Sequence, residues 1–365
     1  MNVQRGDGKD DGGRRGTDAR GFTLTELIVA LAALVVIAAV LLSLSETESP
    51  RGSSRQTRDS IQVHQIIRAM TTWSLSNKDM YPLPSRLDRN NLTVAGPKAG
   101  EDQARHASKD NTGNLLSILI WNGSITPELC VSRAEVSHKV TADDFYETLN
   151  PSACRVNGGK DAQWDPGFSG TADAEEGQGD EANSPRRRAG ISNNSYAHAL
   201  MLDGTARGKN WMNTFVGTQA LLGNRGPLYA GADAQTDVAS GTPAGGWKLA
   251  EGPLGKQSKT LAIHGLRDSW EGNIGYNDSH VTFETRPDPA ETTYRVRGKS
   301  GKVTVNDNMF VDEADEETAT AGSATAAAAD PLMVKTNNWL RPIARVKASS
   351  GPDGKPRYQV TRWVD

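Results

Sequence analysis

Residues 21–44 read Gly21-Phe-Thr-Leu-Thr-Glu26 followed by an apolar run that ends at Leu44. Between positions 22 and 44 the only charged side chain is Glu26, and neither Pro nor Gly interrupts the segment. A helix of about 20 apolar residues spans the hydrocarbon core of a bilayer, and such a helix satisfies all of its backbone hydrogen bonds internally. The sequence therefore predicts a transmembrane helix over residues 22–44.

Basic residues dominate the stretch before the apolar run, namely Arg5, Lys9, Arg14, Arg15 and Arg20. Because cationic flanks remain in the cytoplasm, we expect a cytoplasmic N-terminus and a translocated C-terminal part. A secretory signal peptide would have a shorter apolar core with its cleavage site after that core, whereas the small residue Gly21 lies before it. A plain signal anchor would account for the length and the basic flank, but not for Glu26.

Glu26 is the fifth residue of this apolar segment, where a carboxylate is costly and indicates a functional partner. If the chain is cut after Gly21, the new amino group of Phe22 lies one helical turn from Glu26. That amine can pair with the carboxylate, in its own chain or in a neighbour.

The stretch Gly21–Glu26 resembles the cleavage and methylation motif of type IV prepilins and type II secretion pseudopilins. The resemblance implies that a prepilin peptidase and N-methyltransferase cleaves after Gly21 on the cytoplasmic side and methylates Phe22. It also implies that Glu26 neutralises the Phe22 amine of the adjacent subunit during assembly. The implied partners are that enzyme, other pilin or pseudopilin subunits that contact the N-terminal helix, and the inner membrane. The C-terminal head would be periplasmic.

Length and composition constrain the exported part. The chain has 365 residues, of which 344 remain without the 21-residue leader, so one large or two small domains are expected. The mean hydropathy is −0.56 although the chain includes the apolar run, so the head must be polar with long loops. The net charge of −3 gives no electrostatic reason to expect a nucleic-acid partner. A head of this size is difficult to accommodate on every subunit of a thin fibre. We therefore expect a minor or tip subunit and not the major subunit.

We expect an α+β fold of the pilin-like type: a long N-terminal helix, transmembrane in its first half, packed on an antiparallel sheet. Apolar residues at helical spacing predict a helix from Ser53 to Ser76. The expected parts are a leader (1–21), a transmembrane helix (22–44), the soluble continuation of that helix (45–80) and the periplasmic head. The head would span 81–365, with loop insertions near 160–190 and 313–330.

Shorter patterns predict further elements of the head. Helices are expected at Asn114–Trp121 and Asp143–Leu149. A hairpin is expected over Gly272–Glu284, turning at Asn277-Asp278-Ser279, because Ile274 and Tyr276 alternate before the turn and Val281 and Phe283 after it. The remaining expected strands are Leu261–His264, the hairpin Lys302–Val305 with Met309–Val311, and the hairpin Pro342–Ala348 with Arg357–Val364.

Three short segments of the head are similar to the large prepilin-like proteins of planctomycete-type bacteria. They are Pro127–Ser132, Asn194–Ala197, and His264 followed by Gly272–Phe283. The chain departs from that pattern at Val131, where those proteins have Pro, and at Ser279, where they have the turn Gly. A serine makes a left-handed turn conformation less favourable than glycine does.

Two cysteines and one cluster of acids and histidines are candidate sites. An oxidising periplasm permits a disulfide between Cys130 and Cys154, with two buried free thiols as the alternative. His264, Asp278 and His280 could bind Ca²⁺ or Zn²⁺, because carboxylates suit the first metal and imidazole suits the second. The alternative is that Asp278 caps a tight turn while both histidines decorate strands.

No catalytic pattern is evident in the sequence, so we do not expect an enzyme. No Gly-x-Ser-x-Gly elbow occurs, and the glycine-rich stretch Gly241–Gly246 lacks the Lys-Ser/Thr of a phosphate loop. We expect no resident cofactor apart from the metal just considered. The alternative to an assembly subunit is a membrane-anchored periplasmic binding module or enzyme, which would need no cleavage after Gly21.

Overall fold

The computed structural model describes residues 50–172, 190–230, 247–298, 301–312, 335–352 and 354–365. Residues from Arg51 onward form one compact unit, so the helix that follows the apolar run belongs to the head. Gly21, Phe22, Glu26 and the predicted transmembrane helix lie outside the described residues. Among the described helices, none is both long and apolar enough to cross a bilayer.

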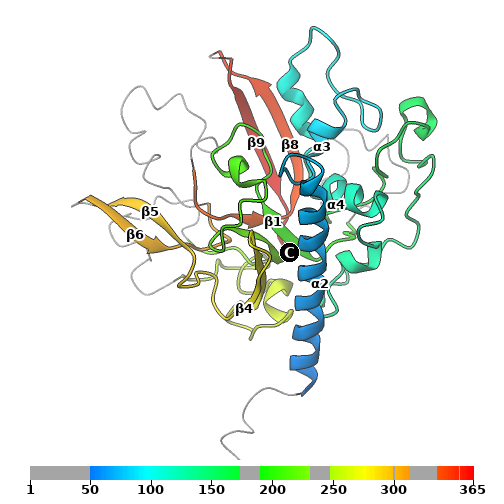
Figure 1. The fold of residues 1–365 in the computed structure, drawn as a ribbon. Helices are drawn as coiled ribbons and strands as arrows, with labels where there is room; N and C mark the ends of the chain where they lie inside the picture. Colours follow the sequence, from blue (N-terminus) through cyan, green and yellow to red (C-terminus); the bar gives the residue numbers. More distant parts are fainter. Residues whose placement is uncertain (1–49, 173–189, 231–246, 299–300, 313–334, 353) are drawn as a thin grey trace, which may run out of the picture. The chain divides into compact units, whose positions relative to one another are not determined.

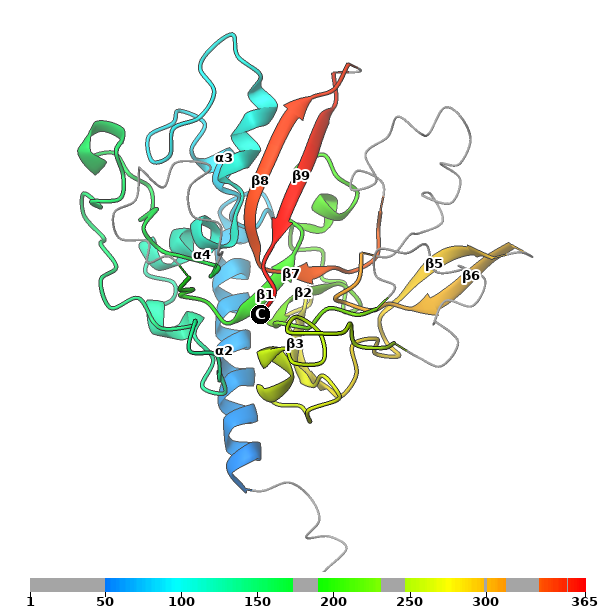
Figure 2. The same cartoon turned by 180° about the vertical axis from the view of Figure 1, so that it is seen from behind.

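Helix α2 (Pro50–Leu75) confirms the helix predicted from Ser53 to Ser76. One face of the helix is apolar and buried, with Val63, Ile66, Ile67 and Met70 each fully inaccessible. At the end of the helix, the backbone N–H of Ser76 and the side-chain amide of Asn77 both donate to the carbonyl of Trp73. Figures 1 and 2 show α2 lying along the sheet, with its first turns extending beyond it.

The central sheet is antiparallel and has the strand order β4-β3-β2-β1-β7. Its strands are β1 (Tyr196–Ala199), β2 (Ala220–Asn224), β3 (Gly272–Tyr276), β4 (Val281–Glu284) and β7 (Leu340–Arg341). The described fold is therefore a mixed helical and antiparallel-sheet fold, as the α+β prediction states. The predicted hairpin at 272–284 is confirmed, with its turn at Asn277–Ser279.

A glycine in β3 sets how closely α2 approaches the sheet. A Cβ atom on Gly275 would lie 2.0 Å from Cδ1 of Ile67 and 3.2 Å from Cγ1 of Val63. Only glycine leaves room for these two helix side chains at that position. The core on this side of the sheet therefore depends on a missing side chain as well as on apolar ones.

Helix α4 (Thr112–Trp121) confirms the helix predicted at 114–121, and it is buried almost all round. Asn111 caps its first turn by accepting a hydrogen bond from the backbone N–H of Asn114 at 2.9 Å. Its Leu115, Leu116 and Leu119 share a core with α2, β1 and β2. The other described helices are α3 (Pro84–Leu87) and the 3-10 helices η1 (Gln103–Lys109), η2 (Pro127–Cys130), η3 (Val156–Gly159), η5 (Arg207–Asn210) and η6 (Lys259–Ala262).

Two further hairpins complete the described fold. Strands β8 (Ile343–Ser350) and β9 (Pro356–Arg362) confirm the predicted C-terminal hairpin. Strand β6 (Gly301–Asn306) pairs with β5 (Thr293–Gly298), which precedes it. The predicted pairing with Met309–Val311 is wrong, because those three residues form a buried irregular segment against the sheet.

Two more element predictions are wrong. Residues 143–149 form turns and bends and not a helix, and Phe145 and Leu149, which would share one face of that helix, are exposed. Residues 261–264 belong to η6 and a bend and not to a strand, because Ser258 caps the 3-10 helix by accepting a hydrogen bond from Thr260 N.

Candidate functional site

The hydrogen-bonding centre of the head is a carboxylate on helix α2. Asp59 has no exposed surface. Its Oδ1 accepts hydrogen bonds from the hydroxyls of Ser132 and Tyr196, the latter at 2.9 Å. Its Oδ2 accepts one from the side-chain amide of Asn273 at 2.7 Å and lies 2.9 Å from Nε2 of His264. We call these five residues the Asp59 cluster. A buried carboxylate is costly unless it is hydrogen-bonded, and here each oxygen has two partners.

The four partners come from segments far apart in the chain. Ser132 follows η2, Tyr196 begins β1, His264 follows η6, and Asn273 lies in β3. The fold therefore brings segments that are widely separated in sequence together on one carboxylate of helix α2.

The surroundings keep Asp59 ionised. Burial raises the pKa of its carboxyl, but the hydrogen bonds and charge of His264 and the hydrogen bonds from Ser132 and Asn273 outweigh burial, so that the pKa is lowered. Burial raises the pKa of Tyr196 well above its usual value, and the neighbouring Asp59 charge adds to this effect. Tyr196 therefore stays protonated and serves as a donor.

A second polar contact holds α2 to the same part of the head. Gln62 lies one turn after Asp59 and donates from Nε2 to the carbonyl of Val131 at 2.9 Å. Its Oε1 accepts from the backbone N–H of Arg133 at 3.0 Å. Helix α2 is thus fixed to residues 131–133 by both ends of one amide, in addition to its apolar face.

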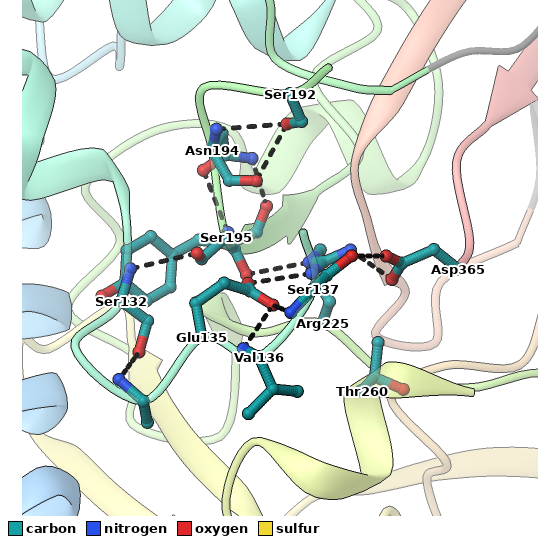
Figure 3. Close-up of polar contacts among 12 residues, drawn as sticks. Ser132, Glu135, Val136, Ser137, Ser192, Asn194, Ser195, Arg225, Thr260 and Asp365 are labelled. Carbon is teal, nitrogen blue, oxygen red and sulfur yellow. Dashed lines mark hydrogen bonds and ion pairs between the residues drawn. The ribbon is translucent and has the colours of Figure 1, made fainter. Parts of the chain in front are cut away.

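The Asp59 cluster continues into a buried ion-pair group (Figure 3). The backbone N–H of Ser132 donates to Oγ of Ser195 at 3.0 Å, and the carbonyl of Ser195 accepts from Nε of Arg225 at 3.2 Å. Arg225 lies between two carboxylates, at 2.9 Å from Glu135 and 2.6 Å from Asp365. Since both acids are hydrogen-bonded to one guanidinium, the group fixes the relative positions of β2, the 132–137 segment and residue 365.

Ser132, Asp59 and His264 do not form a catalytic triad, although all three residue types are present. In a triad the serine hydroxyl bonds to the histidine and the histidine bonds to the acid. Here the serine and the histidine both bond to the acid, one at each oxygen. All three side chains are buried, so a substrate has no access to them. The arrangement is suited to holding α2 in place.

The predicted metal ligands do not converge. His264 lies beside Asn273 on the Asp59 carboxylate, whereas His280 contacts Asp278, with Nδ1 at 2.5 Å from Oδ1. Strand β3 separates the two locations by about 13 Å, at roughly 3.3 Å per residue from Asn273 to the turn. Nowhere in the described part of the chain do three His, Cys, Asp or Glu side chains come together as metal ligands would.

Asp278 instead caps the β3–β4 turn. Its Oδ1 accepts a hydrogen bond from the backbone N–H of His280 at 3.2 Å. The ring of His280 stacks on Tyr276 with a centroid separation of 4.4 Å. Ser279 has a φ of 72°, so the turn does adopt the left-handed conformation that favours glycine. The alternative prediction is confirmed for Asp278, which caps the turn, but neither histidine lies in a strand: His264 follows η6 and His280 immediately precedes β4.

The disulfide expected between Cys130 and Cys154 is not formed, and both residues are buried free thiols. The Cys130 thiol faces the carbonyl of Thr126, the N-cap residue of η2, at 3.9 Å. The Cys154 thiol faces the carbonyl of Thr93 at 3.2 Å. Each thiol therefore has its own local acceptor, in a different part of the head.

Two surface pockets lie away from the Asp59 cluster. One, of about 690 Å³, is bordered by residues 141–147. The other, of about 860 Å³, is lined by the aromatic residues Tyr229, Trp247 and Trp270. Neither pocket includes a member of the Asp59 cluster, so the buried carboxylate and the ligand-sized cavities are separate features.

Comparison of the chain with protein-family models, with curated proteins and with solved structures gave no match.

Proposed function

We propose that the chain is a prepilin-like minor subunit of a type IV pilus or type II secretion pseudopilus. It is processed after Gly21, methylated on Phe22 and assembled through its N-terminal helix. The observation that carries the proposal is the junction at Gly21–Glu26, where a small residue precedes a membrane-length apolar run with one carboxylate at its fifth position. The protein is a single-pass protein of the bacterial inner membrane with a periplasmic head, and it can pass from there into an assembled fibre.

The contacts of α2 support a pilin-like arrangement of the head. The apolar run ends at Leu44, and α2 begins at Pro50, only a few residues later. From Asp59 onward this helix is packed on an antiparallel sheet and fixed by a carboxylate with four partners. This attachment through the Asp59 cluster suits a subunit in which the N-terminal helix transmits force to the head, because the force is distributed over four separate segments.

Substitution of Glu26 separates assembly from processing. The change Glu26→Ala removes the carboxylate that would neutralise the neighbouring Phe22 amine, but it leaves Gly21 and the leader intact. We expect cleavage after Gly21 to persist while co-assembly with other pilin or pseudopilin subunits fails. Leu24→Ala, in the same turn, is the matched control and should retain assembly. Unchanged assembly of the Glu26→Ala protein would count against the proposal.

A further inference from the structure

A buried lysine of the head lies against the side-chain amide of an asparagine. Lys109 is the last residue of η1, and its side chain, like that of Asp88, has no exposed surface. Its Nζ donates to Oδ2 of Asp88 and to Oδ1 of Asn91, each at 2.8 Å, and also to the backbone carbonyl of Asp88. We call Asp88, Asn91 and Lys109 the Lys109 cluster. An amine, a carboxylate and a carboxamide thus meet at one buried nitrogen atom.

The carboxamide of Asn91 is held in one orientation. Its Nδ2 donates to the carbonyl of Pro97 at 3.1 Å, so its Oδ1 faces Lys109. The backbone N–H of Asn91 donates to the carbonyl of Asp88 at 3.2 Å. A Cβ atom on Gly96 would lie 3.1 Å from Cε of Lys109 and 3.3 Å from Cγ of Asn91. The absence of a side chain at Gly96 therefore leaves the room in which the amine and the carboxamide carbon approach each other.

The surroundings favour an uncharged, nucleophilic amine. Burial lowers the pKa of the Lys109 amine, although the hydrogen bond and charge of Asp88 and the charge of Asp110 oppose this shift. A buried ion pair carries the desolvation cost of two charges, and transfer of one proton from Nζ to Oδ2 of Asp88 removes both of them. A desolvated lysine amine is a nucleophile in catalysis, whereas the ammonium form is not. The burial of the amine also keeps competing water away from the carboxamide.

From these observations we infer that the folded chain forms an intramolecular isopeptide bond between Nζ of Lys109 and Cγ of Asn91, with Asp88 as the general base. Asp88 takes one proton from Nζ, and the neutral amine attacks Cγ. The bond between Cγ and Nδ2 then breaks, and Nδ2 leaves as ammonia with the second proton that Nζ releases. Asp88 returns its proton to the ammonia, so one ammonium ion departs. No oxidant, reductant or further reactant is needed.

The bond would staple the loop after α3 to η1. The two residues that it joins lie 18 positions apart in the chain. Asp102, the N-cap of η1, already accepts from the backbone N–H of Ser350 at 2.6 Å, so the stapled segment is attached to β8. A covalent ring restricts the unfolded chain in the way that a disulfide does. The crosslink would involve the head alone, so it is independent of the proposed processing after Gly21.

Mass spectrometry of the full-length folded chain, intact and after tryptic digestion, tests this inference. We expect a mass lower by one ammonia molecule than that of the same chain without the bond. We also expect a branched peptide that joins residues 90–98 to residues 106–133, because trypsin does not cleave after an acylated Lys109. An unchanged mass with cleavage after Lys109 would overturn the inference and leave the Lys109 cluster as an ion pair alone. Loss of ammonia without the branched peptide would overturn it as well.

Two neighbouring asparagines provide a matched pair of variants. Asn91→Ala removes the carboxamide but leaves the ion pair between Lys109 and Asp88, so this chain should fold and show no branched peptide. Asn90→Ala, at an exposed position, should retain it. A crosslink at Lys109 that persists in Asn91→Ala would contradict the assignment.

The rate of crosslinking after refolding tests the role of Asp88. Asp88→Asn cannot accept the proton of Nζ, so the bond should form at least about a hundred-fold more slowly than in the unmodified chain. Equal rates would contradict general-base catalysis by Asp88. If Asp88→Asn does not fold, the comparison of Asn91→Ala with Asn90→Ala still decides whether the bond forms.

Discussion

Asp59 of helix α2 and His264, which lies 205 residues later in the chain, are joined by a buried contact of 2.9 Å between Oδ2 and Nε2. The same carboxylate also receives hydrogen bonds from Ser132, Tyr196 and Asn273. The helix that follows the apolar run is therefore attached to the head by the hydrogen bonds of the Asp59 cluster as well as by its apolar face.

Removal of the Asp59 charge should weaken the head. In Asp59→Asn the charge-assisted hydrogen bonds are lost and one amide donor faces groups that are themselves donors. We expect a loss of about 3 kcal/mol in the free energy of unfolding, measured by urea denaturation of the full chain. Asp144→Asn, at an exposed position, should change the value by less than about 0.5 kcal/mol. Equal effects of the two substitutions on the free energy of unfolding would show that Asp59 does not stabilise the attachment of α2 to the head.

The packing of α2 on β3 should be sensitive to a single methyl group. In Gly275→Ala the new Cβ would clash with Ile67, so we expect a destabilisation of about 1–3 kcal/mol. In the double variant Gly275→Ala/Ile67→Ala the clash is removed, and part of the cost of Gly275→Ala should disappear. A double-mutant cycle on urea midpoints measures this coupling. Strict additivity would contradict the predicted contact.

His198 should make the protein less stable in weak acid. Nδ1–H of His198 donates to the carbonyl of Ala199 at 2.7 Å. Nε2 of the neutral ring is therefore an acceptor, and it receives the hydroxyl proton of Thr112, whose Oγ1 also accepts from the backbone N–H of Ile343. Burial lowers the pKa of His198 from 6.5 to about 4, although the Ala199 carbonyl opposes this shift. Below pH 6.5 the unfolded chain therefore binds a proton at His198, whereas the folded chain binds it only below about pH 4.

The stability that depends on neutral His198 is fully present above pH 6.5 and is lost as the pH falls toward 4. Between pH 8 and pH 5 this loss should be on the order of 2 kcal/mol. His198→Gln cannot titrate, so the difference between its free energy of unfolding and that of the unmodified chain should shrink by that amount over the same range. A constant difference would contradict the prediction.

Asp110 should give the free energy of unfolding a pH dependence opposite in sign to that from His198. Burial raises the pKa of its carboxyl from 3.8 to about 7, against the lowering effect of the hydrogen bonds from Ser85, and its Oδ2 has no hydrogen-bond partner. The folded chain keeps this proton up to about pH 7 while the unfolded chain releases it near pH 3.8. Stability is therefore lost as the pH rises between these values.

The substitution Asp110→Asn abolishes that titration. The stability of the variant relative to the unmodified chain should rise by on the order of 3 kcal/mol between pH 5 and pH 8. Asp161→Asn, at an exposed position, is the matched control and should show no such trend. A flat difference for Asp110→Asn would indicate that Asp110 is already ionised in the folded protein at pH 5.

Local patterns were sufficient to predict the elements whose apolar residues recur with a clear helical or alternating period in the sequence. The helical spacing of Ile66 and Met70 predicted α2, and strict alternation with a turn predicted the β3–β4 and β8–β9 hairpins. Elements with weaker patterns failed. Strand β2 reads Ala-Leu-Leu-Gly-Asn and is buried on both faces, so alternation could not reveal it. The 143–149 segment has apolar residues at helical spacing, but the structure leaves Phe145 and Leu149 in solvent.

The Asp59 cluster could not be predicted from local patterns, because its partners lie 73, 137, 205 and 214 residues away in sequence. One signal was present: Asp59 lies on the same helical stripe as Val63, Ile66 and Met70, where a lone carboxylate indicates a buried partner. The sequence also suggested that His264 and His280 belong together, since both lie close to the β3–β4 segment. The hairpin instead places them at its two ends.

The mature N-terminus of the protein, purified from cells that contain a prepilin peptidase, tests the central claim most directly. Intact-mass and N-terminal peptide mass spectrometry should show a chain that begins at Phe22 and carries one additional methyl group on its amine. A chain that retains Met1 and the basic leader, in membranes where a known prepilin is processed, would contradict the account and favour an uncleaved membrane-anchored binding module or enzyme.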